Sequence, residues 1–396
     1  MIPLSLELVE PLGRLIARPW AVEVTGLQVD SRRIEEGDLF VAVGGGRDFV
    51  EHALARGAAA ALVPDDHAAA LAAIAGAVRR LSKARVVAIT GSTGKTSTKD
   101  ILFAICAPSL RTIANEGNFN NEIGVPLTLC RLEAETELLI AEMGMRGLGQ
   151  IAWLASFTEP DIAVITNIGP VHLELVETIE NVAKAKAELI AALRPGGVAV
   201  VPAHEPLLEP YLTRDDITVE RVPSDSALPF TASFGARHQL ANARTAVAVA
   251  RHLAVALPDE LTVEFSKLRD EERPLPGGGL LLNDCYNANP VSMRAALEHL
   301  VERGRGRRRI AVLGQMAELG RDADAYHREI GELVHRLGIE RVIGVGEHAQ
   351  AYGGDWVPSA GEAASRLQEA LRPGDVVLVK GSRSVGLETV AENLVA

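Results

Sequence analysis

An apolar run that ends in a glycine-rich turn constrains this chain more than any other feature. Residues 85–96 read RVVAITGSTGKT, which predicts a buried β-strand, a tight turn and the start of a helix. The usual phosphate-binding loop has a glycine five positions before the one that precedes Lys-Ser/Thr, but Ile89 stands at that position. The turn is therefore a contracted form of that loop. It predicts nucleotide binding, because N–H groups at a helix N-terminus attract phosphates.

The residue types in this turn fit a nucleotide triphosphate and its metal ion. Two glycines let the backbone N–H groups face an anion, Lys95 can reach terminal phosphates, and Thr96 offers a hydroxyl to Mg²⁺. An ordinary strand-to-helix turn is the alternative interpretation, and the apolar strand before the loop argues against it. The predicted nucleotide site in the turn comprises Gly91, Ser92, Thr93, Gly94, Lys95, Thr96 and Ser97.

Composition and charge exclude several classes of protein. The 396 residues suffice for two or three domains, and a hydrophobic content of 47% is typical of globular proteins. A net charge of −12 argues against a nucleic-acid partner, which would favour a basic surface. The opening residues make a poor signal peptide, and the Ala-rich stretch 58–78 is interrupted by PDDH, so we expect no membrane association. Three widely spaced cysteines suit a reducing compartment, so we expect a cytoplasmic protein. We also expect it to be a monomer.

Alternating strand-like and helix-like segments predict an α/β fold with three domains. Residues 1–84 predict a small α/β unit. Residues 85–275 contain the apolar runs VVAIT, ELLIAEM, IAVITNI and VAVVP separated by helical patterns, which predict a central doubly wound parallel sheet that carries the phosphate-binding loop. After the polar and Gly-rich stretch RDEERPLPGGG, residues 276–396 repeat the alternation and predict a Rossmann-like sheet. Three such lobes suggest a cleft that closes on its ligands.

Two polar residues follow strands of the predicted central sheet. Glu142 ends the run ELLIAEM, and His172 lies just past IAVITNIGPV. Ligands of open parallel sheets lie beyond the carboxyl ends of the strands, so both side chains should approach the loop. With Thr96 they would supply oxygen and nitrogen ligands for Mg²⁺. A solvated carboxylate and a structural histidine are the alternatives.

Eight segments spread over the chain resemble the Mur ligases. They are VDSRRIEEGDLFVAV, TGSTGKT, GNFNNEIGVPLTL, AEMGMRGLGQI, TNIGPVHLE, NDCYNANPVSM, LGQMAELG and VKGSRS. Within that family they are most similar to the members that join D-alanyl-D-alanine to UDP-N-acetylmuramoyl-tripeptide during peptidoglycan precursor synthesis. The resemblance implies these two substrates, ATP and Mg²⁺ as cofactors, and an ADP-forming amide ligase. It covers nearly the whole chain.

The resemblance also implies a catalytic set. Lys95 and Thr96 would hold the phosphates and Mg²⁺, Glu142 would bind the metal, and His172 would bind a second Mg²⁺ shared with the substrate. Lys186 matches the lysine that family members carbamylate to make a carboxylate ligand, and its neighbour Lys184 matches less well. By themselves, the residues around these lysines predict an exposed helix face.

Further positions match binding residues of the family. Asn242 matches an asparagine that contacts adenine, and Arg269, Asp284 and Asn287 match groups near the nucleotide. Lys380 and Arg383 could receive the carboxylate of the amine acceptor, with a charged strand end as the alternative. The implied substrate-binding set is Asp30, Ser31, Arg32, Asn118, Asn120, Asn121, Asn289, Lys380 and Arg383.

Four departures from the family pattern stand out. Gln239 follows His238 where the family has Asn, Gln315 replaces an Asp, and Leu268 replaces the Gly before the arginine at 269. An expected Asp-Gly-His segment is shortened to GGGRDFVEH at residues 44–52, so the uridine contacts there are not predicted.

The chemistry of amide formation fits these residue types. Phosphoryl transfer from ATP activates a carboxylate, and an amine then displaces phosphate. Lysine and Mg²⁺ would offset the repulsion between the two anions. Two alternatives remain: a ligase of the same architecture that adds a diamino acid or glutamates to folate, and a nucleotide switch without ligase activity. The segments GNFNNEIGVPLTL and DCYNANPVSM argue against the first.

Overall fold

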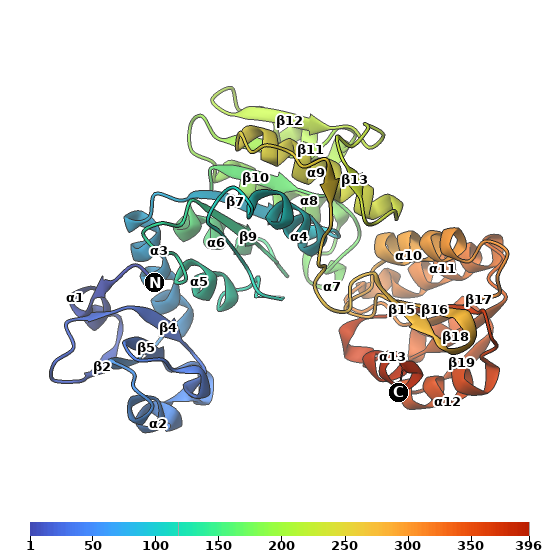
Figure 1. The fold of residues 1–396 in the computed structure, drawn as a ribbon, viewed down its shortest axis with the longest axis horizontal. Coiled ribbons are helices and arrows are strands. Elements are labelled where there is room, and N and C mark those ends of the chain that lie inside the picture. The colour runs from blue at the N-terminus through green and yellow to red at the C-terminus, as the bar shows by residue number, and fades with distance from the viewer. Residues whose placement is uncertain (118, 396) are drawn as a thin grey trace.

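The computed structural model describes residues 1–117 and 119–395 and shows three lobes arranged as an arch, with the central lobe at the top (Figure 1). The predicted substrate residue Asn118 lies outside the described residues. The architecture confirms the predicted three-domain α/β fold. No helix in the described part of the chain is both long and apolar enough to cross a membrane.

The N-terminal lobe is built on a four-stranded sheet in the order β2-β6-β5-β4, in which only the β2–β6 pair is antiparallel. A two-stranded β1–β3 sheet lies beside it. The strands are β1 (Leu4–Ser5), β2 (Arg14–Ala17), β3 (Glu23–Val24), β4 (Gly26–Gln28), β5 (Asp38–Val41) and β6 (Ala60–Val63). The helices are α1 (Leu6–Val9), α2 (Val50–Ala55) and α3 (His67–Leu81), with 3-10 turns η1 (Glu10–Leu12), η2 (Ser31–Arg33) and η3 (Gly44–Phe49).

The central lobe contains a six-stranded, fully parallel sheet in the order β12-β11-β10-β7-β9-β8. Its strands are β7 (Arg85–Thr90), β8 (Thr112–Ala114), β9 (Leu138–Glu142), β10 (Ile162–Ile165), β11 (Val198–Pro202) and β12 (Thr218–Val222). The order places β7 between β9 and β10. The loop after β7 therefore opens at the carboxyl edge of the sheet, where the chain reverses its direction of winding.

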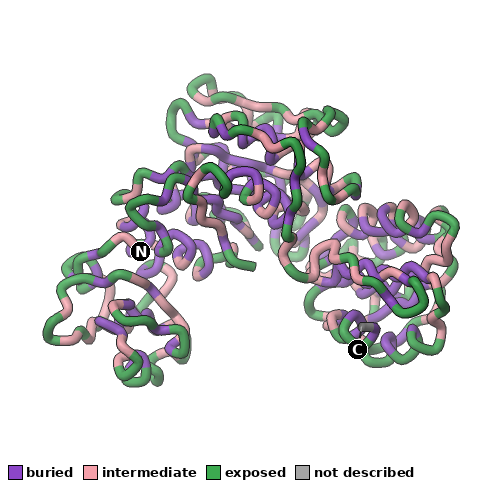
Figure 2. The backbone as a smooth tube through the Cα atoms, viewed as in Figure 1, coloured by how far each residue is buried: buried purple, intermediate pink, exposed green. Residues whose placement is uncertain are grey.

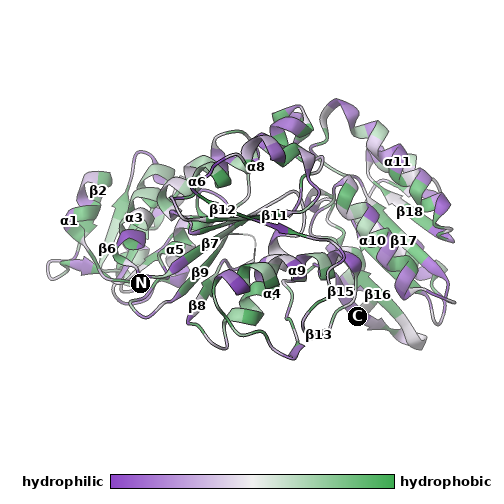
Figure 3. Ribbon diagram, turned by 90° about the horizontal axis from the view of Figure 1, so that it is seen from above, coloured by the Kyte–Doolittle hydropathy of each residue, from purple (hydrophilic) through white to green (hydrophobic). Residues whose placement is uncertain are grey.

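Helices cover both faces of this sheet, as Figure 3 shows from above. Val87 and Ile89 face a core shared with α4 (Lys95–Cys106) and α9 (Arg237–His252), whereas Val86 and Ala88 face the opposite core. This alternation follows from the period of two in a strand. The second core receives α5 (Gly124–Leu129), α6 (Gln150–Thr158) and α8 (Ile179–Ala191). The remaining elements of the lobe are α7 (Leu173–Val176), η4 (Pro206–Tyr211), β13 (Thr231–Ala232) and β14 (Glu260–Leu261).

The C-terminal lobe has a six-stranded sheet in the order β15-β16-β20-β17-β18-β19, parallel except for the β15–β16 hairpin. The strands are β15 (Glu271–Leu275), β16 (Gly279–Asn283), β17 (Arg309–Gly314), β18 (Arg341–Val345), β19 (Asp355–Val357) and β20 (Val376–Lys380). One face packs on α10 (Pro290–Arg303) and α11 (Ala323–Arg336), and the other on α12 (Ala360–Ala370) and α13 (Glu388–Val395). Its 3-10 turns are η5 (Pro276–Gly278), η6 (Gly320–Asp322), η7 (Glu347–Tyr352) and η8 (Arg383–Val385).

Helix α3 joins the first two lobes into one hydrophobic core. It packs on α5 and α6, and one core of buried residues includes Leu39, Leu71 and Leu154. Figure 2 shows buried backbone, in purple, in both lobes. The buried side chain of Arg79 donates from Nε to the Thr158 carbonyl at 2.9 Å. The seam between the two lobes is therefore fixed by both apolar packing and polar contacts.

Candidate active site

Residues 91–94 form a glycine-dependent loop between β7 and α4. Gly91 has φ 152°, and a Cβ there would clash with the Thr166 hydroxyl. Gly94 has φ 76°, and a Cβ there would clash with the Asn242 amide. Glycine is required at both positions because larger residues would meet these side chains. The first turn of α4 then begins at Lys95 with its N–H groups directed out of the helix end.

Asn167 holds the loop in shape. Its Oδ1 accepts the N–H groups of Ser92 at 3.1 Å and Thr93 at 2.9 Å. Lys95 Nζ lies 2.8 Å from the Gly91 carbonyl, which folds the side chain back over the loop. Sequence reasoning missed Asn167, although it lies in the segment TNIGPVHLE just after β10. The rule that polar residues gather beyond strand ends would have identified it.

A cavity of about 390 Å³, called the loop cavity here, lies between this loop and the C-terminal lobe. Its walls also include residues that follow β11 and β12, such as His204 and Pro223, which sequence reasoning missed. The predicted residues that line it are Ser92, Thr93, Gly94, Lys95, Thr96, Ser97, Asn242, Arg269, Asp284, Asn287, Asn289 and Lys380. The fold thus brings together predicted nucleotide groups from two lobes.

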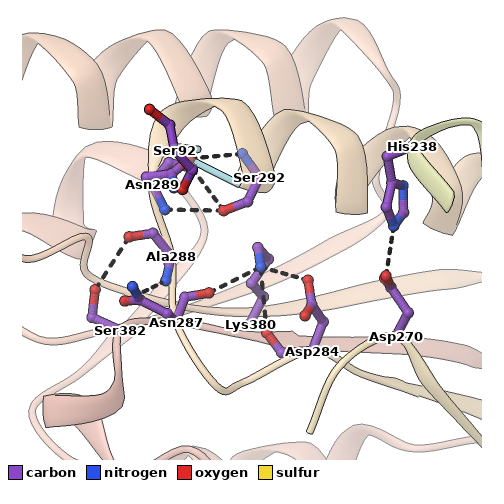
Figure 4. Close-up of polar contacts among 10 residues, drawn as sticks. All are labelled: Ser92, His238, Asp270, Asp284, Asn287, Ala288, Asn289, Ser292, Lys380 and Ser382. Carbon is purple, nitrogen blue, oxygen red and sulfur yellow. Dashed lines mark hydrogen bonds and ion pairs between the residues drawn. The ribbon is translucent and has the colours of Figure 1, made fainter. Parts of the chain in front are cut away.

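Asn289 docks the C-terminal lobe on the loop. Its side chain caps α10 by accepting the Ser292 N–H at 2.9 Å, and its Nδ2 lies 3.5 Å from the Ser92 carbonyl (Figure 4). A Cβ added to Gly169 would lie 2.7 Å from a methyl carbon of Val291, so these two residues are in close contact. The start of α10 is therefore a contact surface for the phosphate-binding loop.

Lys380 lies inside the loop cavity rather than at an open strand end. Its Nζ is 2.5 Å from Asp284 Oδ2 and 3.0 Å from the Asn287 carbonyl (Figure 4). Arg383 lies outside the cavities described here, with an exposed side chain 3.5 Å from Glu388. Of the two groups predicted to receive the acceptor carboxylate, one is already paired and the other is on the surface.

A partly buried pair lines the loop cavity. His238 Nε2 lies 2.6 Å from Asp270 Oδ2 (Figure 4). Burial lowers the pKa of His238, but the hydrogen bond and charge of Asp270 outweigh it, so the pKa lies above its ordinary value. Asp270 and Leu268 both have left-handed backbones, with φ 48° and 62°. A leucine with positive φ is strained, which explains why a glycine suits position 268.

A second cavity of about 650 Å³, called the lysine cavity here, adjoins the first at Lys95, Arg269 and Asn287. Arg269 stacks on the Tyr286 ring, with its guanidinium carbon 4.0 Å from the ring centroid. The predicted residues that line this cavity are Lys95, Asn120, Asn121, Glu142, His172, Lys186, Arg269 and Asn287. The predicted catalytic set therefore gathers around one space.

Glu142 presents an unpaired carboxylate oxygen. Its Oε1 accepts a 2.7 Å hydrogen bond from Asn120 Nδ2, while Oε2 is buried with no hydrogen-bond partner. A buried oxygen without a partner costs free energy unless a ligand satisfies it. This orphan oxygen fits a divalent cation. The Oδ1 of Asn121 instead accepts the N–H of Gly124, the first residue of α5, at 3.0 Å.

Lys186 is buried, contrary to the exposed helix face that its own sequence context predicts, whereas Lys184 is exposed. Burial, and then the nearby charge of Lys95, lower the pKa of Lys186 well below its ordinary value. Burial likewise lowers the pKa of Lys95, against the opposing effect of Glu142. The Lys186 amine is thus held toward its neutral, nucleophilic form.

The donor set around the lysine cavity fits Mg²⁺ only with help from ligands that the substrates bring. In the described residues, no three His, Cys, Asp or Glu side chains come together as a ready metal cage. Glu142, His172 and the Thr96 hydroxyl could each bind a cation. Mg²⁺ normally takes one or two carboxylates and completes its shell with water and phosphate oxygens.

The predicted sugar-nucleotide residues lie in the N-terminal lobe, apart from both cavities. Asp30 and Arg32 form an ion pair of 2.7 Å, and Ser31 is buried with its hydroxyl 3.0 Å from His52 Nδ1. His52 ends the shortened segment 44–52, so this segment still delivers a histidine to the turn after β4.

Comparisons with known proteins agree on one family. The Mur ligase middle domain matches residues 89–222, and the Mur ligase, glutamate ligase domain matches residues 271–383. The chain is 33% identical to UDP-N-acetylmuramoyl-tripeptide–D-alanyl-D-alanine ligase of Escherichia coli K12, over 94% of each chain.

Solved structures show the same relationship. MurF from Acinetobacter baumannii superimposes with a TM-score of 0.85 at 26% identity, covering 99% of this chain and 98% of that one. MurF ligase from Thermotoga maritima, solved in complex with ADP, superimposes with a TM-score of 0.82 at 27% identity, covering 93% of this chain and 96% of that one.

Proposed function

The chain belongs to the Mur ligase family, and on that premise we propose that it joins D-alanyl-D-alanine to UDP-N-acetylmuramoyl-tripeptide while ATP is cleaved to ADP and phosphate. One observation carries the proposal. The loop cavity and the lysine cavity meet at Lys95, so a nucleotide in the first places its terminal phosphate beside a carboxylate in the second. This is the arrangement that phosphoryl transfer to a carboxylate requires.

Each lobe has a distinct task in this proposal. Residues 1–84 bind the uridine nucleotide, with Asp30, Ser31 and Arg32 at the turn after β4. Residues 85–275 bind ATP, and residues 276–396 bind the amine acceptor. In this proposal the protein works as a monomer in the cytoplasm.

The phosphate-binding loop and Lys95 hold the transferring phosphoryl group. The N–H groups of the first turn of α4 face the phosphates, and Lys95 moves from the Gly91 carbonyl to the γ-phosphate. Asn242 lies against Gly94 at the edge of the loop and contacts the adenine. The negative charge that spreads over the phosphoryl oxygens is thereby stabilised by groups already in place.

Thr96, Glu142, His172 and Lys186 hold Mg²⁺ in this proposal. An ion held by these residues would supply positive charge that offsets the repulsion between the ATP phosphates and the substrate carboxylate. The neutral Lys186 amine attacks CO₂, forms an N–C bond and releases a proton, which turns the buried amine into a carbamate anion. The carbamate would add a further anionic ligand to the cavity wall that Glu142 and His172 line.

The amide then forms in two steps on the substrates. A substrate carboxylate oxygen attacks the γ-phosphorus, ADP leaves, and an acyl phosphate results. The amine of D-alanyl-D-alanine attacks the acyl carbon, loses a proton, and expels inorganic phosphate. The original carboxylate oxygen leaves with that phosphate.

An isotope experiment tests this sequence. Tripeptide substrate labelled with ¹⁸O in its terminal carboxylate should yield inorganic phosphate with one ¹⁸O per amide formed, measured by mass spectrometry. Activation by adenylylation would place the label in AMP, and hydrolysis by a nucleotide switch would take its oxygen from water. Either result would contradict the acyl-phosphate route.

A further inference from the structure

The contact between His172 and Glu318 joins the lysine cavity to the C-terminal lobe. His172 stands at the N-terminus of α7 in the central lobe and lines the cavity. Glu318 lies in the segment between β17 and η6 of the C-terminal lobe, 146 positions further along the chain. The two side chains meet with Glu318 Oε2 at 2.5 Å from His172 Nδ1.

The backbone on both sides is shaped for this contact. His172 and Glu318 both have left-handed conformations, with φ 54° and 62°. Such conformations cost free energy in residues other than glycine and persist only where neighbours hold them. Here the Glu174 N–H donates to the Glu318 carbonyl at 3.2 Å, and a Cβ on Gly320 would lie 3.2 Å from the Glu174 backbone. The segment is therefore pressed against the start of α7.

The chemistry of the pair determines which imidazole nitrogen remains available. An ionised carboxylate only accepts hydrogen bonds, so Nδ1 of His172 must carry the proton that it donates to Glu318. In neutral imidazole, Nε2 then keeps its lone pair. Histidines that bind metals usually have such an outer carboxylate, which fixes the ring and its tautomer.

We propose that Glu318 is a positioning residue that fixes the Nδ1-protonated form of His172, so that Nε2 binds a divalent cation more tightly while the C-terminal lobe is docked. The proposal rests on the proposed function, which assigns His172 to the metal site. It makes the metal site a composite of two lobes. The lobe that brings the amine acceptor then also completes the site that activates the carboxylate.

The test measures Mn²⁺ binding to the full-length protein in the presence of the tripeptide substrate and a non-hydrolysable ATP analogue, by electron paramagnetic resonance. Glu318→Ala should weaken the affinity about 10- to 100-fold, as loss of an outer carboxylate does in other metal sites. Glu318→Gln keeps an oxygen that can accept from Nδ1 and should retain most of the affinity. Glu174→Ala removes an exposed carboxylate from the same interface and is the matched control, with no expected change.

A second readout needs no metal. Nitrogen-15 spectra of the histidines should show His172 protonated at Nδ1 in the wild type and a mixture of both tautomers in Glu318→Ala, with His172→Gln assigning the signal. Circular dichroism establishes that each variant folds. If Glu318→Ala does not fold, Glu318→Asp, whose carboxylate is one methylene shorter, should show the weakened Mn²⁺ affinity.

Two results would overturn the proposal. Unchanged Mn²⁺ affinity in Glu318→Ala, together with loss in His172→Ala, would show that the ring needs no outer carboxylate. Full Mn²⁺ affinity in His172→Ala would remove both residues from the metal site. In that case the isotope experiment would still decide the ligase mechanism by itself, because its label follows the substrate oxygen.

Discussion

Lys380 Nζ lies 2.5 Å from Asp284 Oδ2, and only 2% of the Lys380 side chain is exposed. Replacing Lys380 by Met should destabilise the protein by about 3–5 kcal/mol, because it leaves a buried carboxylate without its partner. Urea unfolding measures the change. Arg383→Met is the control: that side chain pairs with Glu388 on the surface, and its loss should change the free energy of unfolding by less than about 0.5 kcal/mol. If both variants lowered the free energy of unfolding equally, the contact between Lys380 and Asp284 would not be a stabilising buried ion pair.

Lys95→Ala should abolish ADP formation while the protein stays folded. Removing one preorganised charge from a phosphoryl-transfer site lowers the rate by at least about 10²-fold. The fold should survive because Lys95 is a half-buried cation near Arg269, and burial already lowers its pKa. A coupled assay of ADP release, with a thermal melt on the same sample, checks both parts. Turnover at the wild-type rate would remove Lys95 from the phosphate site.

Activity should depend on dissolved CO₂ through Lys186. In CO₂-depleted buffer the rate of amide formation should fall, and added bicarbonate should restore it, because the neutral amine needs CO₂ to become a carbamate. Lys186→Ala should be inactive and partly rescued by a short carboxylic acid that occupies the same space. Lys184→Ala, at an exposed position of the same helix, should keep both the activity and its CO₂ response.

The His238–Asp270 pair should make stability depend on pH. The pKa of His238 is raised above 6.5, so its contribution is fully present below about pH 6.5 and is lost as pH rises through the folded-state pKa. The pKa of Asp270 is lowered below 3.8, chiefly through its hydrogen bond to His238 against the effect of burial, so its contribution is lost only in stronger acid.

The His238→Gln variant should therefore be less stable than the wild type, and the difference in unfolding free energy should be larger at about pH 5.5 than at about pH 8.5. Urea unfolding at both pH values measures this difference. His335→Gln, at an exposed position of α11, is the control and should show the same small difference at each pH. If the difference in unfolding free energy between wild type and His238→Gln grew toward alkaline pH, the pKa of His238 would not be raised in the folded protein.

Arg79→Ala should loosen the seam between the first two lobes. It removes the hydrogen bond to the Thr158 carbonyl and one to the Glu159 carbonyl at 3.2 Å, which should cost about 1.5–3 kcal/mol. Arg80→Ala, one position along and exposed, should cost less than about 0.5 kcal/mol. Limited proteolysis between α3 and β7 should become faster only in the first variant.

The strands could be predicted from the sequence because a buried strand is a run of apolar residues. The run from Val86 to Ile89 is apolar on both faces, as a strand covered by helices must be. The short strand β8 left no such signal, since its three residues are only half-buried. Glu142 was found because it ends a strand that is buried along its length.

The rest of the site depends on contacts between distant segments, which no local pattern encodes. Glu318 meets His172 across 146 positions, and Lys380 meets Asp284 across 96. The burial of Lys186 had the same origin: its helix looks amphipathic in isolation, but the side that carries Lys186 closes a cavity formed with another lobe. The family resemblance identified that lysine, and the structure shows that its side chain is buried at the cavity wall.

The continuous core under α3 has a mechanical consequence. Because that core binds the first two lobes together, we expect them to move as one unit. We expect motion relative to the C-terminal lobe to involve residues 266–270, where Ser266 is tied to Asp100 of α4 by a 2.8 Å hydrogen bond and the backbone at Leu268 and Asp270 is left-handed. If this segment is the joint, the angle between that unit and the C-terminal lobe describes how far the molecule opens.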